Sequence, residues 1–286
     1  MSSRRILEIK ELVTKNEYRW NVGITPLSIL PLKTKRLYLG YAVNSDAIEY
    51  MEREIIKVLE SEEYRLQQFV YPIQWDWREV KGSDWTTPVK DQGECGSCVA
   101  FATIGLVESR YKIFIGRPDV NLNLSEADLF FCGCGKCCIK GWFIEPALKY
   151  VRDTGLLDEK NFPYEASYMP CPPSSDNYDR IVRISRFAQI YTEASAKEYL
   201  SKFGPLMVGM DVFDDFSYYT GGIYRNVSGP FLGNHAIVIV GYNEKEKYWI
   251  CKNSWGSGWG EGGWFKLGYG ECGIGTKFWF YAVSFK

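Results

Sequence analysis

The chain has 286 residues, of which 46% are hydrophobic and 16% aromatic, enough to bury a core and unlike the composition of a disordered protein. Its 34 lysines and arginines nearly balance 35 acidic residues, so the charge gives no reason to expect nucleic acid or an anionic membrane as a partner. No apolar run reaches the ~18 residues of a membrane span. We expect no secretory signal either, because the first 20 residues lack an apolar stretch.

The first 72 residues differ in composition from the rest of the chain. They contain no cysteine, whereas nine cysteines follow. Within residues 46–69 apolar side chains recur at helical spacing after Asp46, which can cap a helix. We therefore predict a helix over residues 46–69 and a shorter one over residues 5–13.

Beyond residue 75 the pattern is first helical and then typical of β-structure. Apolar residues with a period of 3.6 over residues 98–115, ending at Gly116, predict a helix with Cys98 in its first turn. Shorter helices are predicted after Ser125, over 144–152 and near 194–203. Strands are predicted over 181–190, 206–212, 236–241, 248–252, 263–267 and 277–283. Helices followed by strands predict an α+β fold with two subdomains.

Cys98 and His235 are the candidates for catalysis. His235 is the only histidine, so acid–base chemistry near neutral pH by an unperturbed side chain depends on it. A cysteine at a helix N-terminus faces unpaired backbone N–H groups and the positive end of the helix dipole, which favour the thiolate. A neighbouring imidazole would make that thiolate a strong nucleophile. Taken alone, however, the two residues are more typical of a buried thiol and a core histidine.

The cysteines admit several explanations. Five of them, at positions 132, 134, 137, 138 and 171, are close in sequence, which indicates disulfide bonds or a metal site. The odd total of nine leaves at least one thiol free or paired with another chain. Disulfides imply an oxidising compartment, in conflict with the missing signal sequence. Cys95 and Cys98 also form a CxxC motif, but nothing else in the chain supports a redox function.

A series of ordered motifs makes the chain resemble the papain family of cysteine proteases over about residues 70–286. Cys98 precedes His235 by 137 residues and Asn253 by 155, in the range expected of that family. The matching motifs are Asp76-Trp77-Arg78, Gln92-Gly93-Glu94-Cys95-Gly96-Ser97-Cys98, Leu124-Ser125-Glu126 with Cys132, Asn234-His235-Ala236, and Tyr248-Trp249-Ile250-Cys251-Lys252-Asn253-Ser254-Trp255-Gly256, followed by Trp259-Gly260 and Gly263-Trp264-Phe265.

The resemblance implies an α+β, papain-like fold with an active-site cleft between two subdomains. The catalytic domain would span residues 73–286, with a helical left subdomain over about 80–180 and a β-barrel-like right subdomain over about 181–286. Residues 1–72 would be an inhibitory pro-segment. Two stretches, Trp20-Asn21-Val22-Gly23 and Leu32-Lys33-Thr34-Lys35-Arg36-Leu37-Tyr38-Leu39-Gly40, resemble the short pro-region of cathepsin B-like enzymes, which lies along the cleft in reverse and blocks it. The alternative is a permanent N-terminal extension.

The resemblance also assigns catalytic roles. Cys98 attacks the peptide carbonyl, and His235 partners the thiolate and then protonates the leaving amine. The side-chain carbonyl of Asn253 orients His235, and Trp255 shields their hydrogen bond from water. The side-chain amide of Gln92 and the backbone N–H of Cys98 form an oxyanion hole, which stabilises charge that develops only in the transition state.

By the same resemblance we expect disulfide bonds Cys95–Cys138 and Cys132–Cys171, and a further Cys134–Cys137 bridge of the kind that cathepsin B has in this region. The competing hypothesis is a zinc site formed by Cys132, Cys134, Cys137 and Cys138, although their spacing lacks two separated CxxC pairs. We therefore expect disulfides rather than a metal. Cys251 is expected to be a buried free thiol, and Cys272 to be free or unusually paired.

The substrate-binding residues implied by the family are Lys140, Gly141, Phe143, Gly209, Gly233, Asn234, Trp255 and Lys277. Gly141 is expected to hydrogen-bond the substrate backbone, and Lys140, which replaces a glycine, narrows or charges the rim. Lys277 lies at the family's position for the floor of the S2 pocket. It either accepts an acidic residue of the substrate or extends towards solvent and leaves an apolar slot.

The expected function is that of a cysteine endopeptidase made as a zymogen. It would act on proteins or peptides as a monomer without a cofactor, in a secreted, lysosomal or vacuolar setting. With one histidine, the chain lacks the additional histidines by which some cathepsins bind a substrate's C-terminal carboxylate. Two alternatives stay open: the same residues could transfer the acyl group to an amine, as in a ligase or transpeptidase, or the protein could be a catalytically silent binding protein.

Overall fold

The computed structural model describes residues 2–44, 68–172 and 180–286, so all but the end of the helix predicted over residues 46–69 falls outside the described residues. The helices are α1 (Ser2–Lys15), α2 (Leu32–Lys35), α5 (Cys98–Ile115), α6 (Ile144–Asp153) and α7 (Glu193–Lys202). The strands are β1 (Trp20–Val22), β2 (Gln74–Asp76), β3 (Arg186–Ile190), β4 (Leu206–Phe213), β5 (Tyr219–Tyr224), β6 (Phe231–Asn243), β7 (Tyr248–Lys252), β8 (Trp264–Gly268) and β9 (Phe280–Ser284). Short helical turns are η1 (Arg36–Tyr38), η2 (Val80–Gly82), η3 (Asp128–Cys132), η4 (Glu159–Asn161), η6 (Asp214–Tyr218) and η7 (Glu271–Gly273).

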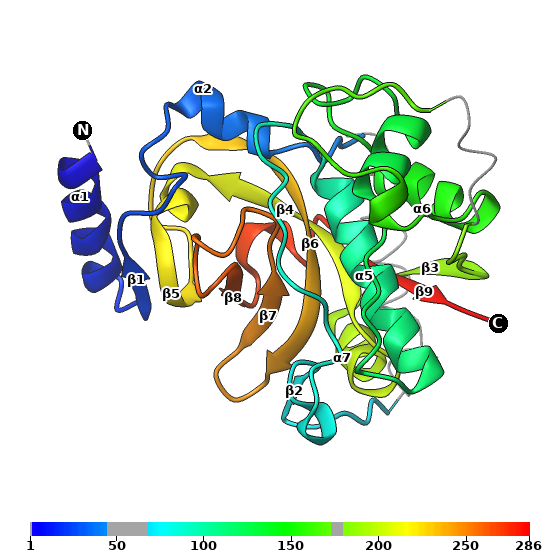
Figure 1. Cartoon of the computed structure of the whole chain (residues 1–286). Helices are drawn as coiled ribbons and strands as arrows, with labels where there is room; N and C mark the ends of the chain where they lie inside the picture. The colour runs from blue at the N-terminus through cyan, green and yellow to red at the C-terminus, as the bar shows by residue number, and fades with distance from the viewer. Residues whose placement is uncertain (1, 45–67, 173–179) are drawn as a thin grey trace.

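Helix α5 packs between the sheet and α6 (Figure 1). It is buried on nearly all sides, which suits its high content of apolar residues. The helix ends where Gly116 adopts a left-handed conformation with φ 68°, as a C-terminal glycine often does. The bounds predicted from the sequence, residues 98–115, are confirmed. Most of the segment after Ser125 is a π-helical turn, η3, and the hydroxyl of Ser125 accepts from the backbone N–H of Asp128 at 2.9 Å.

The strands form one sheet in the order β1-β5-β8-β7-β6-β4-β9-β3, and β2 pairs with the C-terminal end of β6. The structure confirms the strands predicted from residue 206 onwards, although β6 begins earlier than the pattern indicates. The sequence pattern predicts neither β1 nor β5. β1 has only three residues, and Gly221 and Gly222 interrupt the apolar pattern of β5.

Strand β6 is apolar without interruption because both of its faces are buried. Ala236, Val238 and Val240 join a core formed with α5 and α6. Ile237 and Ile239 point to the opposite face and join a second core on the other side of the sheet. The central strand therefore holds the two halves of the molecule together, and His235 lies on it where the halves meet.

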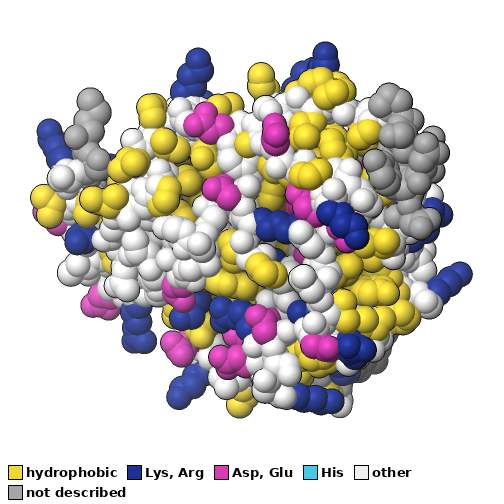
Figure 2. Space-filling view, viewed as in Figure 1, with side chains coloured by type: hydrophobic (Ala, Val, Ile, Leu, Met, Phe, Trp, Pro, Cys, Tyr) yellow, Lys and Arg dark blue, Asp and Glu magenta, His cyan; other side chains and the backbone are white. Residues whose placement is uncertain are grey.

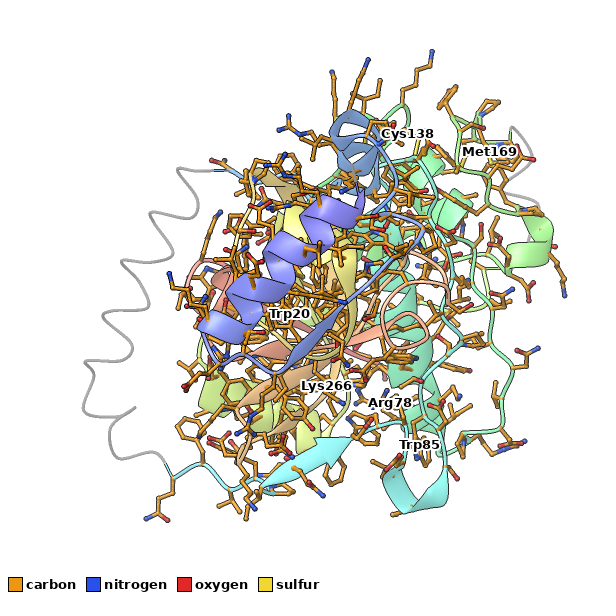
Figure 3. The ribbon with its side chains drawn as sticks, turned by 90° about the vertical axis from the view of Figure 1, so that its left-hand side faces the viewer. Trp20, Arg78, Trp85, Cys138, Met169 and Lys266 are labelled. Atoms are coloured by element: carbon orange, nitrogen blue, oxygen red, sulfur yellow. A yellow bond between two sulfur atoms is a disulfide. The ribbon has the colours of Figure 1, made fainter. Side chains whose placement is uncertain are left out.

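Residues 2–44, here called the N-terminal segment, are part of the second core. Ile9 and Val13 of α1 are buried there, as are Trp20 and Val22 of β1, which pairs antiparallel with β5 at the edge of the sheet. Figure 1 shows α1 and β1 at one side of the molecule, with α2 leading back towards the helical half. Figure 3 looks onto this side and shows Trp20 near α1.

Three disulfide bonds link Cys95 with Cys138, Cys132 with Cys171, and Cys134 with Cys137, the same pairs that the family resemblance implies. All four cysteines of the competing zinc hypothesis are thus in disulfides. Within the described residues, the free cysteines are Cys98, Cys251 and Cys272, and all three are buried.

The surface carries charges of both signs. On the face shown in Figure 2, lysine and arginine side chains are interspersed with acidic ones, in keeping with the near balance of charges in the sequence. None of the helices that the structure describes has the length and apolar character needed to cross a membrane.

Candidate active site

Cys98 is the first residue of α5, and its side chain is fully buried. Its sulfur faces backbone N–H groups of Val99 on its own helix, of Ala236 on β6 and of Gly40 in the N-terminal segment. The contact with Ala236 brings the start of α5 against the strand that carries His235. The contact with Gly40 shows that the N-terminal segment passes directly over Cys98.

His235 is held by Asn253. Antiparallel pairing of β6 with β7, in which Val238 lies opposite Lys252, brings the residue after β7 beside His235. The imidazole Nε2 is 2.8 Å from the side-chain oxygen of Asn253, whereas the buried Nδ1 has no hydrogen-bond partner. The indole of Trp255 lies against the imidazole with 4.8 Å between ring centroids. Nδ1 therefore remains available to exchange a proton, and Trp255 covers the ring.

Burial makes both groups electrically neutral in this arrangement. It raises the pKa of the Cys98 thiol to about 12, although the surrounding backbone N–H groups act in the opposite direction. It lowers the pKa of His235 to about 4, a change that the hydrogen bond to Asn253 only partly offsets. At neutral pH the covered site therefore contains a thiol and a neutral imidazole rather than an ion pair.

Gln92 presents its amide to a peptide carbonyl. Its Nε2 donates to the backbone oxygen of Tyr38 at 3.0 Å and to that of Cys95 at 2.9 Å. Its Oε1 accepts from the hydroxyl of Ser254 at 2.6 Å. This hydrogen bond orients the amide so that Nε2 faces the cleft. The backbone N–H of Ser254 donates to the Asn253 oxygen at 2.8 Å, so consecutive residues support both Gln92 and His235.

The N-terminal segment continues through the cleft with its backbone hydrogen-bonded to both walls. The backbone N–H of Trp142 donates to the oxygen of Gly40 at 2.7 Å, and Ala42 donates to the oxygen of Trp142 at 2.9 Å. On the opposite wall, Tyr41 donates to the backbone oxygen of Asn234 at 3.2 Å. The bridge between Tyr41 and Trp142 is parallel. Backbone groups from both halves of the molecule thus bind a peptide in the cleft.

Two glycines permit this close approach. A Cβ on Gly40 would lie 1.9 Å from the backbone oxygen of Gly96. A Cβ on Gly141 would lie 2.0 Å from the backbone oxygen of Gly40, and Gly141 has a positive φ of 70°. Gly141 thus lies against the backbone of the bound segment, although its own N–H donates to Cys137 and the hydrogen bonds to the segment come from Trp142.

The side chain of Tyr41 fills a pocket beside the cleft. A Cβ on Gly209 would lie 2.1 Å from the Tyr41 ring, and the ring of Phe278 is 5.7 Å away between centroids. The Tyr41 side chain in turn lines an adjoining cavity together with Phe143, Phe278 and Lys277. Of the other predicted substrate residues, Gly233 lies near the side chain of Leu39 and Lys140 is exposed.

Sequence reasoning missed three contributors to the site. It gave no role to Ser254, which orients Gln92, or to Asp211, whose carboxylate binds both Asn234 and Lys277. It also gave none to Tyr164, whose hydroxyl donates to the backbone oxygen of Gln92 at 2.9 Å and lies 2.7 Å from the hydroxyl of Ser97. Only Ser254 lies within a motif recognised in the sequence, so the other two required the tertiary structure.

Comparison with known proteins gives consistent results. A sequence profile described as papain family cysteine protease matches residues 71–282. A cathepsin L-like proteinase of Fasciola hepatica is 34% identical over 226 residues, covering 74% of this chain and 66% of the relative. Ananain of Ananas comosus is 34% identical over 212 residues, covering 71% of this chain and 59% of the relative. The match therefore spans less than two thirds of these relatives' own length.

Among solved structures, a digestive procathepsin L2 proteinase from the larval midgut of Tenebrio molitor is similar over nearly the whole chain. The superposition covers 98% of this chain and 89% of that one, with a TM-score of 0.79 and 27% sequence identity. The similarity thus includes the N-terminal segment as well as the two halves that form the cleft.

Proposed function

The chain belongs to the papain family of cysteine proteases, and we propose that it is a cysteine endopeptidase made as a zymogen. The observation that carries the proposal is the peptide of residues 38–42, whose backbone is bound on both sides of the cleft across Cys98. A cleft that binds a peptide backbone over a potential nucleophile has the arrangement that peptide hydrolysis requires.

The chemistry follows from the geometry. Transfer of the thiol proton of Cys98 to the free Nδ1 of His235 generates the thiolate, which attacks the carbonyl carbon of the substrate. The amide of Gln92 then donates to the developing oxyanion. The imidazolium returns its proton to the departing amine, which leaves an acyl-enzyme, and water hydrolyses the thioester with His235 as general base. Asn253 keeps the imidazole oriented throughout.

The N-terminal segment is proposed to inhibit the enzyme. It places the oxygen of Tyr38 on the Nε2 of Gln92, where the oxyanion would be stabilised, and the N–H of Gly40 at the sulfur of Cys98. Its burial of the site favours the neutral thiol and imidazole. Occupation of the cleft and suppression of the thiolate would therefore keep the intact chain inactive.

We also propose an endopeptidase rather than an exopeptidase mode. His235 is the only histidine and is held by Asn253, so no second histidine is available to bind a terminal carboxylate. The proposed setting is a monomer in an oxidising compartment without a cofactor, and the three disulfide bonds support that compartment.

The activity is tested with internally quenched peptides whose ends are both blocked. After acidic incubation, the wild-type chain should cleave them internally, whereas Cys98→Ser should lower cleavage by several orders of magnitude. Cys251→Ala, at another buried free thiol, is the matched control and should remain active. Cleavage by the Cys98 variant at the wild-type rate would refute the assignment. Products joined to an added amine would instead indicate acyl transfer.

The zymogen proposal is tested by following the chain itself. Acidic incubation should convert the wild-type protein, and not Cys98→Ser, to a form that begins near residue 70. Peptide cleavage should rise in parallel with this conversion, as measured by N-terminal sequencing and fluorescence on the same samples. Full activity of the intact chain without conversion would contradict the proposal.

A further inference from the structure

The pocket that holds Tyr41 has an unexpected charge arrangement. Tyr41 and Lys277 line one cavity beside the cleft, but the ammonium group of Lys277 is 2.7 Å from Oδ1 of Asp211. The same oxygen accepts from the side-chain amide of Asn234 at 2.6 Å. Strand pairing explains the second contact, since Asp211 on β4 lies opposite Asn234 on β6.

Lys277 is directed by this carboxylate and by aromatic rings rather than towards the occupant of the pocket. Its ammonium lies 4.8 Å from the ring centroid of Phe278 and 5.8 Å from that of Phe231. The side chains of Lys277 and Asp211 are 35% and 17% exposed, so both charges are partly withdrawn from water. Under these conditions the two charges compensate each other.

We propose that Asp211 is a specificity-determining residue, because it neutralises Lys277 and thereby makes the pocket select an aromatic side chain and reject a carboxylate. The proposal rests on the proposed proteolytic function, since it names the substrates of that same cleft.

The occupant of the pocket agrees with this assignment. Tyr41 places an uncharged ring against the glycine face of Gly209 and beside Phe278. A substrate carboxylate in the place of Tyr41 would lose its hydration, and Lys277, already paired with Asp211, would not compensate that loss. The acidic Glu145, which also lines the cavity, would repel the carboxylate. Loss of the charge on Asp211 would leave Lys277 as an unpaired cation in the wall and reverse this selection.

The inference can be tested without catalysis, in the full chain carrying Cys98→Ala. Tyr41→Glu should lower the melting temperature more than the neutral, isosteric Tyr41→Gln. Asp211→Asn retains an oxygen that can accept from Asn234. It should reduce the difference in melting temperature between the Tyr41→Glu and Tyr41→Gln chains by at least half. Adding Lys277→Met should restore the difference. If Asp211→Asn leaves the difference unchanged, Asp211 does not control the charge of the pocket.

The same cycle is then measured on substrates of the matured enzyme. Peptides would carry Tyr, Gln or Glu two residues before the cleaved bond, the position that the family resemblance assigns to this pocket. In the wild type, kcat/KM should be at least tenfold higher for Tyr than for Glu. Asp211→Asn should raise the Glu-to-Gln ratio of kcat/KM about tenfold, and Lys277→Met should cancel that gain.

The two measurements separate the inference from the function on which it rests. If the wild type cleaves Glu as well as Tyr, Lys277 is available to substrate and the inference is wrong. If no peptide is cleaved by any variant, the proposed proteolytic function fails, while the melting temperatures still decide whether Asp211 sets the charge of the pocket.

Discussion

Two parts of the N-terminal segment bind the rest of the molecule in different ways. Residues 38–42, the cleft part, make backbone hydrogen bonds to Gln92, Trp142 and Asn234, to which Leu39 and Tyr41 add side-chain contacts. Residues 2–35, the anchor part, are held by buried side chains. Backbone contacts of the first kind can be made by almost any peptide, whereas side-chain contacts of the second kind belong to this segment alone.

The anchor part combines an apolar and a charged attachment. Trp20 is 4% exposed and packs against the rings of Tyr219 and Tyr224. Lys35, only 3% exposed, donates to one oxygen of Asp214 at 2.7 Å, while Arg5 lies 3.4 Å from the other. The part of the segment that covers Cys98 therefore need not be the part that holds the segment in place. The four predictions below test that division, beginning with the largest effect.

The first prediction concerns what the cleft part does to Cys98. Burial lowers the pKa of the His235 imidazole to about 4 and raises that of the thiol to about 12, so the pair is neutral between these values. Removing the segment should return the pKa of the Cys98 thiol from about 12 towards its ordinary value of 9.0. The fraction of thiolate at pH 7, and with it the rate of alkylation by iodoacetamide, should then rise about 10³-fold. Mass spectrometry of the modified peptides measures this rate. Cys251, buried in both states, is the internal control, and equal rates for Cys98 before and after removal would contradict the prediction.

The second prediction removes the apolar anchor. Trp20→Ala should weaken docking of the segment by about 3–5 kcal/mol, since it deletes a buried indole from an aromatic cluster. The intact chain should then cleave peptide several hundredfold faster before any processing. Asn21→Ala, at the neighbouring exposed position of β1, should have little effect. Tight inhibition in the Trp20 variant would show that the cleft part suffices by itself.

The third prediction removes the charged anchor. Lys35→Met leaves the carboxylate of Asp214 with Arg5 alone and should weaken docking by about 2–3 kcal/mol. Because Lys35 is buried, the effect should change little between low and moderate salt. Lys33→Met, on the exposed face of the same short helix, is the matched control. A loss equal to that of the control would mean that the ion pair contributes nothing to inhibition.

The smallest effect is expected from the cleft part itself. Gly40→Ala would place a Cβ 1.9 Å from the backbone oxygen of Gly96 and should cost about 1–3 kcal/mol in local displacement. The intact anchor should nevertheless keep the segment bound, so unprocessed activity should rise less than in Trp20→Ala. Gly23→Ala, whose Cβ would approach the Thr220 side chain rather than backbone, is the control. A larger effect from Gly40 than from Trp20 would reverse the proposed division of roles.

The sequence predicts the elements that have a strong local signal. Helix α5 has continuous apolar periodicity and a terminal glycine, and β7 has a compact apolar pattern, so both bounds follow from the pattern. β1 escapes prediction because its stability comes from pairing with β5 and from burial of Trp20, neither of which a local pattern contains. The position of residues 38–42 in the cleft likewise depends on contacts with distant residues, so no local pattern predicts it.

The candidate catalytic residues and their order can be recognised from the sequence alone, because Cys98, His235, Asn253 and Gln92 lie in motifs with characteristic local spacing. Only the tertiary structure decided their electrical state and the charge of the adjoining pocket. Burial suppresses the charges of the Cys98–His235 pair, and the pairing of β4 with β6 places Asp211 where it compensates Lys277. Both effects arise from groups far apart in the chain, and desolvation and Coulomb energies depend on spatial rather than sequence distance.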